Sequence, residues 1–230
     1  KGLKEKGASM DKIEMVDRLD EVSTKLQDII SLANMRLDDL NNPKYKDLTF
    51  YEDTLLWIGR EYQKRHISYI EISDTTLVKK DISNARMLDQ IHRILPLVKK
   101  ETGVDIRFLA AIRRIPLTLV KQNITTSNYL TEAIQALKVV CKDPYVVGSD
   151  FIGEEINDIS DLQPAIEQIV KYVREEDPDF TIRIHAGEND CLRDNVAKSI
   201  ECIKEALKPG QKMPRFRLGH GLYTADLNTK

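Results

Sequence analysis

The sequence predicts an α/β protein, a (β/α)₈ barrel of the TIM type, of which the 230 residues account for only part. Two observations predict this fold. Short apolar runs alternate with longer segments whose apolar residues recur every three or four positions, the pattern of parallel strands connected by helices. In addition, histidine or aspartate residues stand at the ends of three different strands, where a barrel carries its catalytic groups.

The first 65 residues are expected to form a helical segment that packs on the barrel or is inserted in it. Apolar residues recur in steps of three and four at Met15, Leu19, Val22, Leu26 and Ile29. The repeat is too short to favour a coiled coil over an accessory surface helix, although a partner helix stays open. Asn41-Asn42-Pro43 is expected to end this helix, and a second helix is expected from Tyr51 to Arg65.

Residues 66–230 are expected to form the partial barrel. Its strands are predicted at residues 67–73, 104–112, 145–150, 180–184 and 215–218, and its helices at 88–98, 129–141, 162–173 and 196–207. Strict alternation leaves an open doubly wound sheet as the other possibility. A nucleotide-binding sheet of that kind favours a glycine-rich turn after its first strand, and residues 74–80 contain no glycine. The barrel is therefore preferred, with about three of its eight strands missing.

Composition excludes several classes of protein. The net charge is -2, so no electrostatic argument favours nucleic acid or an anionic membrane as a partner. No apolar run is long enough to span a bilayer, and no signal peptide opens the chain. Cys141, Cys191 and Cys202 form no zinc-ligand spacing and no obvious disulfide framework. These features predict a soluble, cytoplasmic protein. Because the chain begins at Lys1 and stops soon after its last histidine, we expect a fragment or a processed chain.

Two histidines carry most of the functional signal. His185 ends the strand at 180–184 and is followed by Gly187 and Glu188, and His220 ends the last strand between Gly219 and Gly221. A neutral imidazole can ligate zinc. A carboxyl three residues beyond such a ligand can donate a proton at neutral pH if burial raises its pKa. Because neighbouring parallel strands lie ~5 Å apart, both histidines could share one site.

Other polar residues receive structural interpretations. Asp150 ends a strand and could be catalytic, but we favour a structural role in which it holds a loop through backbone amides. Gly153 could present its backbone N–H to a ligand, although glycine is also the commonest turn residue. His66 and His92 are expected to be helix residues without a site role. Arg113-Arg114 could meet a phosphate, but a solvated pair is the preferred interpretation.

Three motifs, taken together and in order, resemble the adenosine deaminase family of the amidohydrolase superfamily. They are Val146–Glu155 (VVGSDFIGEE), His185-Ala186-Gly187-Glu188 and Arg217-Leu218-Gly219-His220-Gly221. Tyr69–Ile72 is more weakly similar to the family's second strand. The resemblance covers roughly residues 67–225 and implies that the predicted strands are the second to sixth of a barrel.

The resemblance implies zinc-dependent hydrolysis of the 6-amino group of adenine, in a nucleoside or a nucleotide, with release of ammonia. By position, His185 would be a zinc ligand and Glu188 would protonate a purine ring nitrogen. His220 would orient and deprotonate the zinc-bound water, and Gly153 would hydrogen-bond the purine through its backbone. The reaction follows the general logic of a metal that lowers the pKa of its water.

The chain also departs from the family. It contains no His-x-His pair, which ligates zinc in the family's first strand, and it ends before a strand with paired aspartates. One usual zinc ligand is therefore present, so we expect the other ligands in other residues and no tight zinc binding by this chain alone. Ser73 stands where the family often has arginine.

The preferred hypothesis is part of an adenosine deaminase-like enzyme that acts on adenosine, deoxyadenosine or a phosphorylated adenine nucleotide. A homo-oligomer or a larger assembly stays possible. The rival hypothesis is a catalytically inactive barrel that serves as a binding or assembly module. A third, another amidohydrolase acting on a different amine or amide, suits Glu188 less well.

Overall fold

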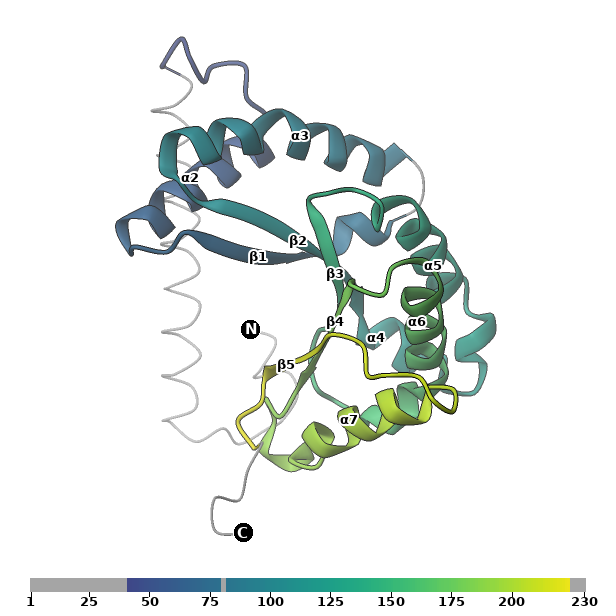
Figure 1. Cartoon of the computed structure of the whole chain (residues 1–230). Coiled ribbons are helices and arrows are strands. Elements are labelled where there is room, and N and C mark those ends of the chain that lie inside the picture. Colours follow the sequence, from purple (N-terminus) through teal and green to yellow (C-terminus); the bar gives the residue numbers. More distant parts are fainter. Residues whose placement is uncertain (1–40, 80–81, 224–230) are drawn as a thin grey trace, which may run out of the picture.

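The computed structural model describes residues 41–79 and 82–223. Five parallel strands form one sheet in sequence order. The strands are β1 (Tyr69–Asp74), β2 (Asp105–Arg113), β3 (Val146–Ile152), β4 (Thr181–Ala186) and β5 (Phe216–His220). The sheet is curled, and helices lie along its outer side (Figure 1). The α/β class and the curled, all-parallel sheet of a partial barrel are thus confirmed.

Helices follow the strands in the expected alternation. The longer ones are α2 (Phe50–Lys64), α3 (Ile82–Thr102), α5 (Asn128–Val140), α6 (Gln163–Glu176) and α7 (Asn195–Glu205). Their positions match the sequence prediction to within a few residues, apart from α3, which begins six residues earlier. Short helical segments also occur, at α4 (Arg114–Leu119), η2 (Thr75–Val78), η3 (Lys121–Thr126), η4 (Ile159–Leu162) and η5 (Asp190–Leu192). The apolar stripe expected between residues 10 and 40 lies outside the described residues.

Local signals set both ends of α2. Thr49 and Glu52 form a capping box, in which each side chain accepts a hydrogen bond from the other residue's backbone N–H. At the C-terminal end, His66 has a left-handed backbone with φ of 58°. The N–H groups of His66 and Ile67 donate to the carbonyls of Gln63 and Tyr62, which otherwise lack helical partners.

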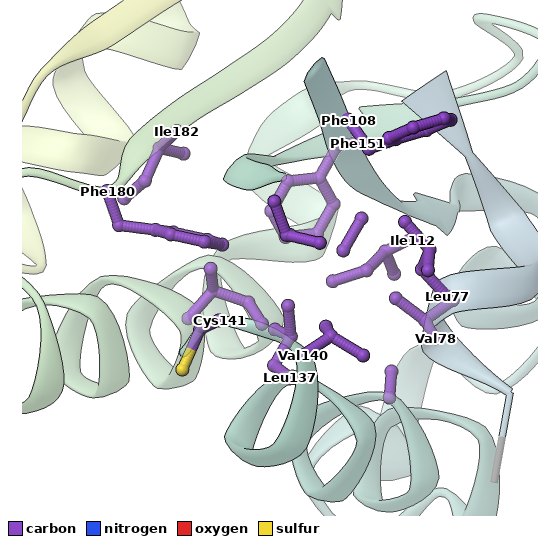
Figure 2. Close-up of a cluster of buried hydrophobic side chains, with 14 of the residues drawn as sticks. Leu77, Val78, Phe108, Ile112, Leu137, Val140, Cys141, Phe151, Phe180 and Ile182 are labelled. Carbon is purple, nitrogen blue, oxygen red and sulfur yellow. The ribbon is translucent and has the colours of Figure 1, made fainter. Parts of the chain in front are cut away.

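The hydrophobic core lies between the outer face of the sheet and the helices. Ile106, Phe108 and Ile112 alternate along β2 and are fully or almost fully buried. Figure 2 shows Phe108 and Ile112 in one cluster with Leu77 and Leu137, which come from η2 and α5. Strand side chains point to opposite faces with a period of two, so the residues between these positions face the inside of the curl.

The inner face of the curl carries charged side chains from several strands. Arg217 of β5 forms a hydrogen-bonded ion pair with Glu71 of β1, although β1 and β5 are the two outermost strands of the sheet. This contact crosses the concave face, because three strands separate its partners in the sheet. It requires the strong curvature that a barrel has and a flat sheet lacks.

None of the helices in the described part of the chain has the length and apolar character that a bilayer-crossing segment needs.

Candidate functional site

The two histidines identified in the sequence lie side by side at the C-terminal ends of β4 and β5. In the strand register His185 is opposite Gly219, and Ala186 is opposite His220. The two imidazole rings have their centroids 5.2 Å apart, with an angle of 66° between their planes. The structure therefore brings both residues into one site.

Gly219 makes room for the His185 ring. A Cβ atom built on Gly219 would lie 2.8 Å from Cγ and 2.9 Å from Cδ2 of His185. Contacts of that length are far inside the van der Waals limit, so only glycine fits opposite the imidazole. The glycine before His220 thus serves the neighbouring histidine and packs one strand end against the other.

Asp150 orients the side chain of His185 through its Nδ1 atom. Its carboxylate is fully buried, and the His185 Nδ1–H group donates to Oδ1 over 2.9 Å. Arg183 and Ser73 donate to Oδ2 over 2.7 and 2.6 Å. The expectation that Asp150 holds a loop through backbone amides is wrong, because its carboxylate points into the curl and meets side chains of β1 and β4.

This contact fixes which nitrogen of His185 is available to a ligand. In a neutral imidazole whose Nδ1–H donates to Asp150, the lone pair of Nε2 is free to bind a ligand. Metal-binding histidines characteristically bind through one nitrogen and donate the other N–H to a carboxylate. The pair His185–Asp150 therefore has the arrangement of a ligand and its supporting acid.

The segment after β4 carries Glu188. Its carboxylate is 3.7 Å from His220 Nε2, and the Glu188 side chain is 50% exposed. The described residues thus do not bury this carboxyl. Gly187 has a left-handed backbone with φ of 74°, and a Cβ there would lie 2.5 Å from Val196 Cγ2. Glycine is required at this turn for both its conformation and its packing.

A second buried acid, Glu155, was not identified from the sequence. Its carboxylate accepts hydrogen bonds from the backbone N–H groups of Gly187, Glu188 and Asn189, at 3.0, 2.8 and 2.8 Å. The Asn195 side chain donates to it as well, over 2.9 Å. Burial by itself raises the pKa of this carboxyl, but the four hydrogen bonds outweigh it and hold the pKa below its ordinary value.

Arg114 lies beneath the same segment. It is fully buried and donates to the backbone carbonyls of His185, over 2.8 Å, and Asn157, over 3.3 Å. Burial lowers the pKa of the guanidinium, and the nearby carboxylates of Glu155 and Glu188 raise it in part. The expected solvated arginine pair is therefore wrong for Arg114, whereas Arg113 is exposed.

The remaining candidates occupy different places. Gly153 follows β3 with φ of 99°, is exposed, and lies at the same end of the sheet as both site histidines. His92 pairs with Asp143 just before β3, at the opposite end of the sheet. His66 belongs to the end of α2.

A pocket of about 530 Å³ opens beside Glu188. It is lined by Glu154, Glu155, Ile156, Glu188, Asn189, Asp190 and Tyr223. The pocket is therefore formed by the segments that follow β3, β4 and β5, on the same side as the histidines.

The described residues do not complete a metal site. Within the part of the chain that the structure describes, no three His, Cys, Asp or Glu side chains lie close enough together to hold a metal ion. A catalytic zinc ion takes three protein ligands. His185 suits one of these places, so the described donors fit a metal only in part.

A comparison with protein-family models found no match, and a comparison with curated proteins found none with significant similarity.

Proposed function

We propose that this chain forms part of an enzyme that hydrolytically deaminates the adenine ring of a nucleoside or nucleotide. The reaction consumes water and releases ammonia, leaving the corresponding inosine compound. One observation supports this proposal above all others: His185, Glu188 and His220 converge at one end of neighbouring strands, with Glu188 3.7 Å from His220 and the two rings 5.2 Å apart. Hydrolytic deamination needs one group that donates a proton to the substrate ring and a nearby group that accepts a proton from the attacking water.

Glu188 and His220 divide the proton transfers in this proposal. Glu188 donates a proton to a ring nitrogen while water attacks the adjacent C6 carbon, which lets the ring accept the electron pair. His220 takes a proton from the attacking water and returns it to the amino group, which leaves as ammonia when the C6–N6 bond breaks. The hydroxyl left on C6 then gives its proton to the Glu188 carboxylate, which forms the C6 carbonyl of the inosine product and restores the acid. General acid–base transfers of this kind each contribute about 10²–10⁴-fold to rate.

The proposal includes zinc, held in part by Nε2 of His185. Bound zinc would supply a water of lowered pKa as the nucleophile. Asp150 would orient His185 for this ligation, because it fixes the tautomer through Nδ1. The other zinc ligands would come from residues outside those described, and the setting would be the cytoplasm, where the three free thiols stay reduced.

Ultraviolet absorbance of the purified protein with zinc and adenosine, deoxyadenosine or adenine nucleotides tests the proposal. We expect deamination by the wild type and loss of it in Glu188→Gln, with zinc content unchanged because Glu188 is not a proposed ligand. Glu201→Gln, an exposed glutamate on α7, is the matched control and should retain turnover. Equal turnover of Glu188→Gln and wild type would remove the acid from the mechanism.

The rival function, a binding or assembly module without catalysis, is motivated by the sequence, which contains no His-x-His pair. In that case no adenine compound is turned over at any zinc concentration, and wild type and Glu188→Gln behave alike. Zinc content measured on the same samples separates an inactive protein that holds metal from one that lacks a metal site.

A further inference from the structure

The buried Glu155 carboxylate takes no part in the proton transfers proposed above. Glu155 is 4% exposed, and both of its carboxylate oxygens accept hydrogen bonds. Oε1 accepts from Gly187 N and Asn195 Nδ2, and Oε2 accepts from the amides of Glu188 and Asn189. Burying a carboxylate is costly unless it is hydrogen-bonded, and here three of its four donors belong to one short loop.

The β4 loop, as we call the segment from His185 at the end of β4 to Asn189, carries the proposed acid. Three consecutive amides point toward one carboxylate, as they do in anion-binding nests of the backbone. Arg114 holds the same loop from its other end, by donating to the carbonyl of His185. The Glu188 side chain itself is half exposed, so the loop backbone, more than side-chain packing, determines where its carboxyl starts.

We propose that Glu155 is a positioning residue that fixes the loop of residues 187–189 and thereby places the Glu188 carboxyl for proton transfer. This inference rests on the proposed deaminase function. It assigns Glu155 no contact with substrate in catalysis. Its effect passes through the three amides, whose positions set the Cα position of Glu188 and the direction of its side chain.

Replacing the carboxylate by an amide separates positioning from the shape of the side chain. In Glu155→Gln one carboxylate oxygen is replaced by an NH₂ group. This group cannot accept the hydrogen bonds that the N–H donors had made to that oxygen. At least two donors then lose their acceptor, and the loop shifts. A displacement of ~1 Å at a catalytic group costs roughly 10²-fold in rate, so we expect kcat to fall ~100-fold with a much smaller change in KM.

Asp158 offers a matched control three residues along the chain. Its carboxylate accepts from the backbone N–H of Ser160 over 2.9 Å and pairs with Lys198, but it contacts none of the three loop amides. Like Glu155 it has a lowered pKa, here because of the hydrogen bond from Lys198. Asp158→Asn should lower stability and leave kcat unchanged. Glu155→Gln would give the same result if Glu155 had only a structural role.

The experiment combines amide hydrogen exchange with steady-state kinetics on the full chain. We expect the amides of residues 187–189 to lose protection in Glu155→Gln and to keep it in Asp158→Asn, with kcat following the same order. If Glu155→Gln does not fold, as judged by circular dichroism, Glu155→Asp serves instead. It keeps the charge but withdraws the carboxylate by one methylene, and should lose part of the protection and part of kcat.

Each outcome decides a separate point. Unchanged exchange at 187–189 would overturn the role of Glu155 in holding the loop. Faster exchange with unchanged kcat would overturn positioning while leaving the deaminase function intact. A wild type that deaminates no adenine compound overturns the proposed function, and the positioning role with it, and the exchange data then report only on the loop.

Discussion

The two histidine-bearing strand ends are built in different ways. At β4, His185 is held by the Asp150 carboxylate at its side chain and by Arg114 at its carbonyl, and its side chain is 23% exposed. At β5, the His220 side chain is 40% exposed, lies 3.7 Å from the Glu188 carboxylate and makes an edge-type contact with the His185 ring. One end is fixed by buried charges, whereas the other is set mainly by its backbone.

The backbone of the β5 end is unusual. His220 has a left-handed conformation with φ of 59°, followed by Gly221 with φ of 63°. Non-glycine residues adopt this region infrequently, and such strain is concentrated at functional sites. The amides of Gly221 and Leu222 then donate to the carbonyls of Ala186 and Gly187, so the β5 end depends on the β4 loop for its own position. The β4 end is therefore held by its own buried contacts, and the position of the β5 end depends on it.

The largest effect should come from removing the buried charge at β4. Asp150→Ala leaves Arg183 without its carboxylate and His185 without its acceptor. Breaking a buried ion pair by removing one partner typically costs about 3–5 kcal/mol, and we expect a loss of that order in the free energy of unfolding measured with urea. Asp179→Ala is the matched control at an exposed pair with Arg215, and should change stability by about 0.5 kcal/mol or less. Equal effects of the two substitutions would show that the β4 end is not specially supported.

A methyl group at the contact between the two ends should have the next largest effect. In Gly219→Ala the new Cβ would lie 2.8 to 3.0 Å from three ring atoms of His185, so the ring must move off Asp150. Overpacking of this kind costs about 1–3 kcal/mol, and turnover should fall together with stability. Gly210→Ala serves as a comparison, because no atom lies within 4 Å of its new Cβ and only the strain of its φ of 82° remains. If Gly219→Ala matches the wild type in stability and turnover, the two strand ends do not depend on this contact.

Periodicity was sufficient to predict the α/β class and the alternation of parallel strands and helices. The five strands and the main helices each carry a repeat long enough to be recognised, and the two histidines stand at strand ends that the register brings together. The short helix α4 was missed, because six residues beginning Arg114-Ile115-Pro116 are too few to show a helical stripe.

Tertiary burial, in contrast, could not be derived from the chain. Glu154 and Glu155 are adjacent and chemically identical, yet only Glu155 is buried. The only sequence signal for Glu155 is its position five residues after Asp150. The packing of the β4 loop against Glu155, which the sequence does not reveal, is what gives this carboxylate its role. For the same reason the loop-holding role expected for Asp150 belongs to Glu155, and Arg114 was wrongly assigned to solvent.

Lowering the pH should affect the β4 and β5 ends differently. We expect this effect on stability to be smaller than the effects of Asp150→Ala and Gly219→Ala. The pKa of Glu155 lies below its ordinary value of 4.5, so its contribution to stability is complete above about pH 4.5 and is lost as the pH falls through the lower, folded-state pKa. The difference in unfolding free energy between wild type and Glu155→Gln should therefore stay constant above that pH and narrow below it.

Amide protection factors sharpen this comparison within one molecule. The amides of residues 187–189 donate to a titratable carboxylate, whereas those of Gly221 and Leu222 donate to backbone carbonyls, which do not titrate in this range. Between about pH 6 and about pH 3, protection at 187–189 should fall before protection at 221–222. Because the β5 amides use carbonyls of the β4 loop, their protection should follow once that loop has loosened. The reverse order would mean that the β5 end supports β4, and that the direction of dependence inferred from the contacts is wrong.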